Sequence, residues 1–150
     1  MIVSRHAAIV VAAFALAACR GRGAPIAPAP ETPEQTVAQF LAAVNARELD
    51  RMALLWGTER GPSPVSSPNT PEVQRRQLEI MQRLLITDSH RVVRSEPVPS
   101  DPGKRRLTVE MVRGNRRVQV PFLMVSARTG GWLVQEIDLD VAMALVRPGA

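Results

Sequence analysis

The chain has 150 residues, of which 45% are hydrophobic, and its 19 basic side chains outnumber 14 acidic ones to give a net charge of +5. This length suits one ordinary domain, and the hydrophobic fraction excludes a disordered or fibrous chain. The single cysteine excludes a disulfide within the chain, and one cysteine with two histidines leaves no set of metal ligands. We therefore expect neither a metal site nor a cofactor.

Residues 1–18 read MIVSRHAAIVVAAFALAA, in which Arg5 precedes an unbroken apolar run of 12 residues from Ala7 to Ala18. A permanent transmembrane helix needs roughly 20 apolar residues, so this run is too short. A basic start, a short apolar segment and small residues at its end are typical of a secretory signal peptide. We expect residues 1–18 to be one.

The signal ends in Leu16, Ala17, Ala18 and Cys19, which resemble a bacterial lipobox. The resemblance implies cleavage between Ala18 and Cys19, a diacylglycerol on the Cys19 sulfur, and a second acyl chain such as palmitate on the new amine. The alternative is a plain secretory signal followed by an unpaired thiol, which is a liability in an oxidising compartment. Lipidation is the favoured interpretation.

A lipid on Cys19 would anchor the protein in the bacterial cell envelope. Arg20 follows the cysteine, and under enterobacterial sorting a residue other than Asp there implies the outer membrane, facing the periplasm. Without residues 1–18 the chain keeps 18 basic and 14 acidic side chains, a net charge of +4. An anchored envelope domain rarely meets nucleic acid, so we expect none as a partner. Anionic head groups or glycans fit that charge better.

Residues 19–31 are rich in Gly, Ala and Pro and show no apolar period, which predicts a lipidated flexible tether. At Thr32 a helix start follows, because Thr32 and Gln35 form a capping box and Pro33 suits the first helical position. One face of this helix carries Val37, Phe40, Leu41 and Val44.

A break at residues 45–48 separates this helix from a second, short one that ends at Gly57 and turns Met52, Leu55 and Trp56 inward. Residues 57–70 hold three prolines and predict a loop. Thr70 and Pro71 then repeat the helix-start pattern. The third helix is expected to bury a stripe made of Val73, Ile80, Met81, Leu84 and Leu85.

After Thr87 the apolar period changes from about 3.6 to 2, which predicts strands. We expect strands at residues 89–98, 105–113, 116–128 and 132–140, with tight turns at Gly114–Asn115 and at residues 129–131. Pro121 marks a bulge or an edge, because proline cannot donate to a ladder. Residues 32–146 therefore predict an α+β domain in which N-terminal helices cover one face of a curved antiparallel sheet.

This order of elements resembles the nuclear transport factor 2-like superfamily. The likeness is carried by residues 32–56, similar to its paired opening helices, and by residues 116–138, similar to its closing hairpin with a Gly-Gly-Trp turn. It implies a cone-shaped, cystatin-like fold whose sheet curls around a cavity. Relatives use that cavity to isomerise or cyclise ketones with an Asp base and a Tyr or Asp donor, to hold a ligand, or to dimerise through the sheet face.

No catalytic residue can be carried over, because the chain has no tyrosine and no Asp aligns with the family's base. Asp88, Ser89 and His90 are contiguous, and in a strand Ser89 points away from His90, which argues against a catalytic triad. The strands also carry polar residues, namely Glu110, Gln135, Glu136 and Asp138. If the sheet curls around a cavity, a few of these could point inward, and a carboxylate there would have a raised pKa. A solvated face is the simpler interpretation.

Arg105, Arg106, Arg113, Arg116 and Arg117 surround the turn at Gly114. Charges at strand edges and turns prevent association between strands, which is the favoured interpretation. An anionic partner is the alternative.

The sequence thus favours an envelope-anchored, non-enzymatic domain that binds a small apolar ligand or an envelope protein. A cavity enzyme of the ketosteroid isomerase or polyketide cyclase kind, and an assembly role through a homodimer joined by its sheet faces, remain open. The residues expected to line the cavity are Phe40, Val44, Trp56, Met111, Phe122 and Trp132.

Overall fold

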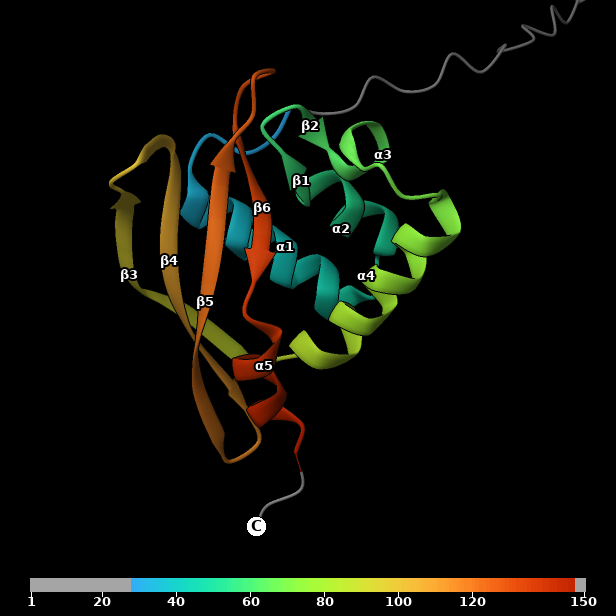
Figure 1. Cartoon of the computed structure of the whole chain (residues 1–150). Coiled ribbons are helices and arrows are strands. Elements are labelled where there is room, and N and C mark those ends of the chain that lie inside the picture. The colour runs from blue at the N-terminus through green and yellow to red at the C-terminus, as the bar shows by residue number, and fades with distance from the viewer. Residues whose placement is uncertain (1–27, 148–150) are drawn as a thin grey trace, which may run out of the picture.

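The computed structural model describes residues 28–147, and Figure 1 shows a helical layer on one face of a curved sheet. The predicted signal peptide, Cys19 and most of the expected tether lie outside the described residues. The order of elements is α1 (Pro33–Ala46), α2 (Leu49–Leu55), β1 (Gly57–Thr58), β2 (Gly61–Pro62), α3 (Ser63–Ser66), α4 (Pro71–Leu85), β3 (Ser89–Val98), β4 (Asp101–Arg113), β5 (Arg116–Ser126), β6 (Trp132–Ile137), α5 (Leu139–Ala142) and η1 (Met143–Leu145).

The predicted caps fix where the two long helices begin. The Thr32 hydroxyl accepts from Gln35 N at 3.2 Å, and Gln35 Oε1 accepts from Thr32 N at 3.3 Å, which completes the capping box of α1. Thr70 Oγ1 accepts from Val73 N at 3.4 Å and caps α4 in the same way. Each cap satisfies a backbone N–H that the first helical turn leaves without a partner.

The main sheet is antiparallel with the order β3-β4-β5-β6, which confirms the predicted α+β class with helices on one face. α1 contacts β4 and β6, and α2 and α4 pack against α1. Pro121 lies where pairing between β5 and β6 begins, because Phe122 pairs with Ile137 and Asp138 N donates to Pro121 O at 3.0 Å. The N–H that proline lacks therefore falls just outside the part of β5 that pairs with β6, where no ladder hydrogen bond is lost.

Residues 57–70, expected to be a loop, contain a small hairpin and a short helix. Gly57 pairs with Pro62 and Thr58 with Gly61. A Cβ on Gly57 would lie 2.2 Å from Gly61 O, so the close approach of these two strands requires glycine there. Ser63 N donates to Trp56 O at 2.7 Å and thereby joins α3 to the end of α2.

The predicted inward stripe of α4 is partly wrong. Val73 and Ile80 are each 44% exposed, whereas Leu78, Met81, Gln82 and Leu85 are buried. Gln82 Nε2 donates to Val44 O at 3.3 Å, near the end of α1. Val44 O also accepts from Arg47 N at 3.1 Å, so the Gln82 amide adds a second hydrogen bond to this carbonyl. The buried face of α4 therefore includes a polar residue, Gln82, that apolar spacing does not indicate.

One hydrophobic cluster joins the helices to the sheet. Its fully buried members include Phe40 of α1, Met52 of α2, Leu85 of α4, Met111 of β4 and Phe122 of β5. Leu107, Val109 and Met111 are all fully buried, as the period of two on β4 predicted. The six residues expected around a cavity all belong to this cluster or pack against it, and they are Phe40, Val44, Trp56, Met111, Phe122 and Trp132.

Residues 29 and 30, expected to belong to the tether, pack against the sheet. Pro30 O accepts from Trp132 N at 2.8 Å, and Ala29 packs against a small cluster that includes Val125 and Leu133. A Cβ on Gly131, whose φ is +79°, would lie 2.3 Å from Ala29 O. The ordered domain therefore begins before Thr32, and Gly131 allows this contact.

We expect Gly131→Ala to destabilise the domain more than Gly130→Ala. Both glycines have positive φ, so both substitutions carry backbone strain of about 1–3 kcal/mol, but a Cβ on Gly130 meets nothing within 4 Å. Urea unfolding of the two variants measures the difference. The extra cost should vanish in a chain that starts at Glu31, because that chain lacks Ala29, and equal costs in the longer chain would contradict the contact.

Candidate functional site

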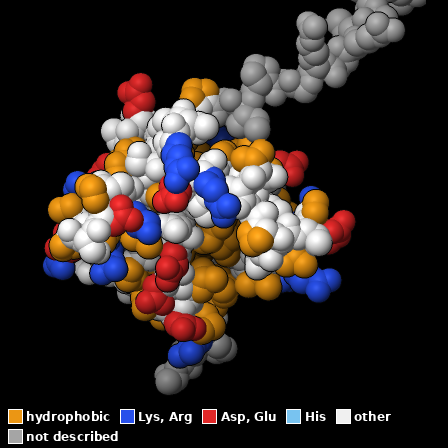
Figure 2. Space-filling model, turned by 45° about the horizontal axis from the view of Figure 1, so that its top comes forward, with side chains coloured by type: hydrophobic (Ala, Val, Ile, Leu, Met, Phe, Trp, Pro, Cys, Tyr) orange, Lys and Arg blue, Asp and Glu red, His pale blue; other side chains and the backbone are white. Residues whose placement is uncertain are grey.

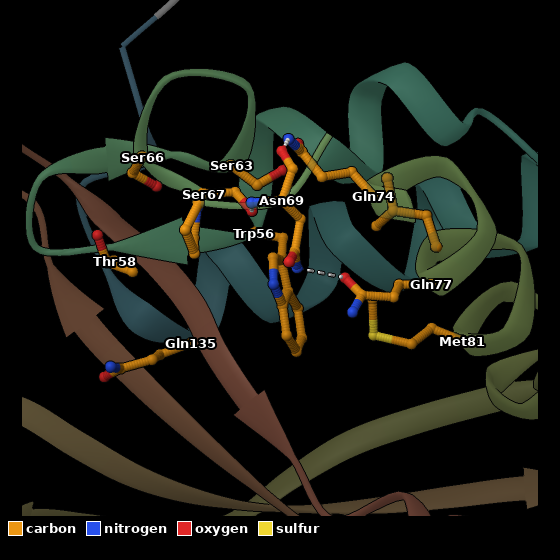
Figure 3. Close-up of a pocket in the computed structure, with 13 residues that line it drawn as sticks. Trp56, Thr58, Ser63, Ser66, Ser67, Asn69, Gln74, Gln77, Met81 and Gln135 are labelled. Atoms are coloured by element: carbon orange, nitrogen blue, oxygen red, sulfur yellow. Dashed lines mark hydrogen bonds between the residues drawn. The ribbon is translucent and has the colours of Figure 1, made fainter. Parts of the chain in front are cut away.

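A pocket of about 190 Å³ lies between the β1–β2 hairpin, the segment that follows α3, and α4 (Figure 3). We call it the Trp56 pocket, because Trp56 lies in Figure 3 between the side chains of α4 and those of Thr58, Ser66 and Ser67. It is lined by Trp56, Gly57, Thr58, Ser63, Ser66, Ser67, Pro68, Asn69, Gln74, Gln77, Leu78, Met81 and Gln135.

The lining of the Trp56 pocket is uncharged. Trp56, Leu78 and Met81 supply apolar surface, and the polar members carry only hydroxyl or carboxamide groups. None of these side chains gains or loses a proton near neutral pH. The pocket can offer hydrogen bonds and an aromatic ring, and it lacks both a counter-ion and an acid or base.

A β-bulge brings Gln135 into this lining. Leu123 pairs with Glu136 and Met124 with Val134, so Gln135 has no residue opposite it in the β5–β6 ladder. Bulges of this kind redirect one side chain and are common beside functional sites. Val134, the residue before it, forms a parallel bridge with Trp56, which holds β6 against the end of α2.

Two buried polar atoms of the lining have no hydrogen-bond partner, Ser66 Oγ and Gln135 Oε1. Ser66 is only 7% exposed. A buried polar atom left unpaired costs about 1–3 kcal/mol, so native proteins seldom keep one without a reason. The lining of one small pocket therefore holds two buried polar atoms that have no hydrogen-bond partner within the domain.

The other polar groups of the pocket are held in place. Ser63 Oγ donates to Ala53 O at 3.3 Å. Asn69 Nδ2 donates to Gln77 Oε1 at 3.5 Å, the contact drawn in Figure 3, and Gln74 Nε2 donates to Asn69 O at 2.8 Å. These bonds tie the segment after α3 to α4, so the shape of the pocket does not depend on a ligand.

The residues predicted to line an apolar cavity take a different place. Phe40, Val44 and Met111 are fully excluded from solvent and form part of the filled core. Trp56 alone of the six lines the Trp56 pocket, and its ring lies 6.1 Å from that of Phe40. Of the other predicted residues, Phe40 supports the pocket wall from behind through its contact with Trp56.

Asp88, Ser89 and His90 do not form a triad. The Asp88 carboxylate accepts from Gly114 N at 2.7 Å and stabilises the β4–β5 turn. Ser89 and His90 are successive residues of β3 and point to opposite faces of the sheet. Burial lowers the pKa of His90, which favours the neutral imidazole.

Glu110 was expected on a solvated face, and its side chain is only 9% exposed. Its Oε1 accepts from Arg91 Nε at 2.8 Å and from Arg117 Nη1 at 2.7 Å, across both neighbouring strands. The hydrogen bond from Arg91 is the main reason that the pKa of Glu110 is lowered, and the charges of both arginines add to the effect. A carboxylate held in this way is a weak base, the opposite of the raised pKa that a catalytic base needs.

Of the five arginines expected around Gly114, only Arg113, Arg116 and Arg117 lie beside that turn, because Arg105 and Arg106 pair with Pro97 and Glu96 toward the other end of β4. Four of the five have partners within the domain. Besides Arg117, Arg105 donates to Ser95, Arg113 to Arg83 O at 3.3 Å, and Arg116 to Ala144 O at 3.3 Å. The last two acceptors lie near helix ends, where basic side chains are favourable. Basic side chains are interspersed with acidic and apolar ones on the face shown in Figure 2. These arginines stabilise the fold, and this weakens the case for an anionic partner.

Sequence reasoning missed the Trp56 pocket because residues 57–70 were expected to be an unstructured loop. One signal was present: Ser63–Pro64 repeats the sequence pattern of Thr32–Pro33 and Thr70–Pro71, a hydroxyl residue followed by proline, although Ser63 is the first residue of α3 and its hydroxyl does not cap the helix. The bulge at Gln135 has no such signal, because a bulge depends on the register of two strands.

Within residues 28–147, no group of three His, Cys, Asp or Glu side chains could hold a metal ion. No helix in the same range is long and apolar enough to cross a membrane. No family model matches the chain, and no curated protein resembles it closely enough to count as a match.

Proposed function

We propose that this protein is an envelope-anchored lipoprotein whose domain binds a small uncharged polar ligand in the Trp56 pocket. The observation that carries the binding proposal is the pair of buried, unpartnered atoms, Ser66 Oγ and Gln135 Oε1, in one pocket lining. The lipobox at Leu16–Cys19 carries the anchoring proposal, with the outer membrane facing the periplasm as the location.

The fold proposed for this function is the cone of the nuclear transport factor 2-like superfamily. It is supported by the order of the elements, with helices α1, α2 and α4 before a four-stranded antiparallel sheet and packed on one of its faces. The pocket lies beside α4 and the β1–β2 hairpin, at the edge of the filled core, because Leu78 and Met81 belong both to its lining and to the core cluster.

Binding is favoured over catalysis by the chemistry of the lining. An isomerase or cyclase needs a general base and an acid or donor that stabilises the enolate. The pocket has hydroxyl and amide donors, but none of its lining residues is Asp, Glu, His, Lys, Cys or Tyr. The same lining favours a polar ligand over the apolar one that the sequence suggested.

The test pairs two serine variants in the chain from Arg20 to Ala150, which keeps every residue that the structure describes. We expect Ser66→Ala to raise the free energy of unfolding by about 1–3 kcal/mol, because it removes a buried hydroxyl without a partner. Ser63→Ala should lower that energy, because the Ser63 hydroxyl donates to Ala53 O. Urea unfolding measures both.

The same variants are then titrated with neutral fragments such as acetamide, glycerol and N-methylacetamide. The NMR signals of the Trp56 indole and the Gln135 amide report binding. Wild type should show shifts of both signals with a dissociation constant on the order of 1 mM or weaker, and Ser66→Ala should bind more weakly although it is more stable. Gln119→Ala, on an exposed part of β5, is the control. A Ser66→Ala variant that is less stable, or fragments that leave both signals unmoved, would refute the proposal.

A further inference from the structure

We infer that the ligand of the Trp56 pocket is a single neutral sugar ring, either free or at the end of a glycan chain. This inference rests on the function proposed above and deepens it. It is drawn from four properties of the pocket: its charge, the donors and acceptors it offers, its aromatic ring and its size.

The uncharged lining selects against charged ligands. A phosphate or carboxylate would need an arginine, a lysine or a set of free backbone N–H groups, and an amine would need a carboxylate. Glu59 and Arg60, in the adjoining β1–β2 turn, do not line the pocket, and Glu59 is paired with Arg128 at 3.4 Å. The ligand must therefore bring hydrogen-bonding groups without net charge.

The donors and acceptors match those of sugar hydroxyls. A carboxamide offers an oxygen that accepts and a nitrogen that donates, and a serine or threonine hydroxyl does both. Asn69, Gln74, Gln77 and Gln135 supply four carboxamides to a lining that also contains Thr58 and three serines. A sugar hydroxyl likewise donates and accepts, so each can serve two of these groups. A purely apolar ring would leave Ser66 Oγ and Gln135 Oε1 without partners and would not use the remaining donors and acceptors of the lining, which lowers its affinity relative to a sugar.

Trp56 gives the pocket an apolar surface beside this polar lining. It is half-buried, it packs against Phe40, and it lies in Figure 3 with Asn69 and Gln77 on one side and Thr58 and Ser67 on the other. A pyranose ring combines a flat C–H face with a rim of hydroxyls, and it needs both kinds of surface at once. The arrangement of aromatic ring and flanking amides supplies them.

The volume limits the ligand to one ring. A cavity of about 150 Å³ can hold a benzene molecule. The Trp56 pocket, at about 190 Å³, has room for one six-membered ring with some of its substituents. It is far smaller than the 300–1,000 Å³ typical of pockets for larger ligands.

Ser66 Oγ and Gln135 Oε1 need a small rearrangement to take part. Solvent does not reach either atom in the unliganded domain. Rotation about χ1 of Ser66 and about the last torsions of Gln135 would turn these groups toward a bound hydroxyl. Binding would then give both atoms the partners that they lack.

The experiment titrates the chain from Arg20 to Ala150 with glucose, galactose and N-acetylglucosamine. The NMR signal of the Trp56 indole reports binding. We expect at least one of them to bind with a dissociation constant on the order of 1 mM, within the range of single small ligands. Three related compounds should each bind at least tenfold more weakly. Glucosamine adds a positive charge, glucuronate adds a negative charge, and cyclohexanol lacks most of the hydroxyls. Methyl glycosides separate the two sources, because equal or tighter binding of the blocked sugar indicates the end of a glycan chain.

Variants place the sugar in the pocket. Gln135→Ala and Trp56→Phe should each weaken binding at least tenfold, and Gln119→Ala should leave it unchanged. If Trp56→Phe does not fold, Gln135→Ala alone decides, because Gln135 lies in a bulge on the surface of the pocket.

The outcomes separate this inference from the function on which it rests. If the neutral fragments shift the Trp56 and Gln135 signals but no sugar does, the sugar inference is wrong and the binding function stands. Adenosine, a neutral ligand with a flat aromatic base, is titrated in the same way. If adenosine binds more tightly than every neutral sugar, or if charged and neutral sugars bind equally, the inference is overturned. If neither fragments nor sugars bind, both proposals fall.

Discussion

Phe40→Ala is expected to lower the free energy of unfolding by about 3–5 kcal/mol, the usual cost of emptying a buried phenylalanine site. Phe40 has no exposed surface and belongs to the hydrophobic cluster that joins the helices to the sheet. The centroid of its ring lies 6.1 Å from that of Trp56. Since small domains are stable by only about 5–15 kcal/mol, this loss removes a large share of the total. Urea unfolding of the chain from Arg20 to Ala150 measures it.

The same substitution should also weaken ligand binding, because Phe40 supports the wall of the Trp56 pocket from behind. Phe40→Leu, which keeps most of the buried volume, should cost less in both respects and provides a folded variant if Phe40→Ala does not fold. Ile80→Ala is the matched control on α4: Ile80 is 44% exposed, so its truncation should change stability by no more than about 0.5–1 kcal/mol. His90→Ala should be mild and leave binding intact.

The pairing of these variants tests the packing of the helical layer. A Phe40→Ala variant as stable as Ile80→Ala would mean that α1 is not docked on the sheet through this residue. A well-folded His90→Ala variant that lost binding or an activity would revive a histidine-based site. His90 is half-buried and does not line the Trp56 pocket, so we expect neither result.

The elements that sequence alone predicted well are those set by local chemistry. Thr32 and Thr70 begin helices because their hydroxyls satisfy nearby backbone N–H groups, and this depends only on residues one turn away. Strand β3 was predicted over the residues that form it, and the turn at Gly114 has a φ of +60°, which glycine adopts without strain.

The predictions that failed depend on contacts between distant residues. α4 offers two apolar stripes, and its spacing alone could not show that Gln82 would be buried against Val44 O and Ile80 left outside. Glu110 alternates with apolar neighbours as a solvated residue would, but arginines from two other strands enclose it. The alternation identified its face of the sheet correctly and said nothing of its partners.

The candidate site was even less accessible from sequence. Its residues come from Trp56 at the end of α2, from β1, from α3 and the segment after it, and from α4 and β6. Gln135 enters only because two strands pair with a shift of one residue. A shift of one residue changes which side chains face a given surface, so strand alternation could not place Gln135 in a pocket. Of the pocket residues, Trp56 alone had been predicted to line a cavity, and Gln135 had been named only among several strand residues that could point inward.

Cys19→Ser is expected to abolish lipid labelling completely. If Leu16–Cys19 is a lipobox, the diacylglycerol is attached to the Cys19 sulfur, and Cys19 is the only cysteine of the chain. Cells that express the full chain are grown with a labelled palmitate analogue and separated into membrane and soluble fractions. Wild type should carry the label in the membrane fraction, and the variant should accumulate as unlabelled precursor, longer by the 18 residues of the uncleaved signal.

A thiol at another place provides the control. Asn115→Cys, added to the Cys19→Ser chain, places a cysteine at the exposed β4–β5 turn. It should restore neither label nor cleavage, because lipid attachment would depend on the residues around the cysteine and not on the thiol alone. Label on Cys19→Ser, or its normal cleavage and membrane partitioning, would contradict lipidation at Cys19. The binding chemistry of the Trp56 pocket would be unchanged by that result, since none of the residues that line it lies before Trp56 in the chain.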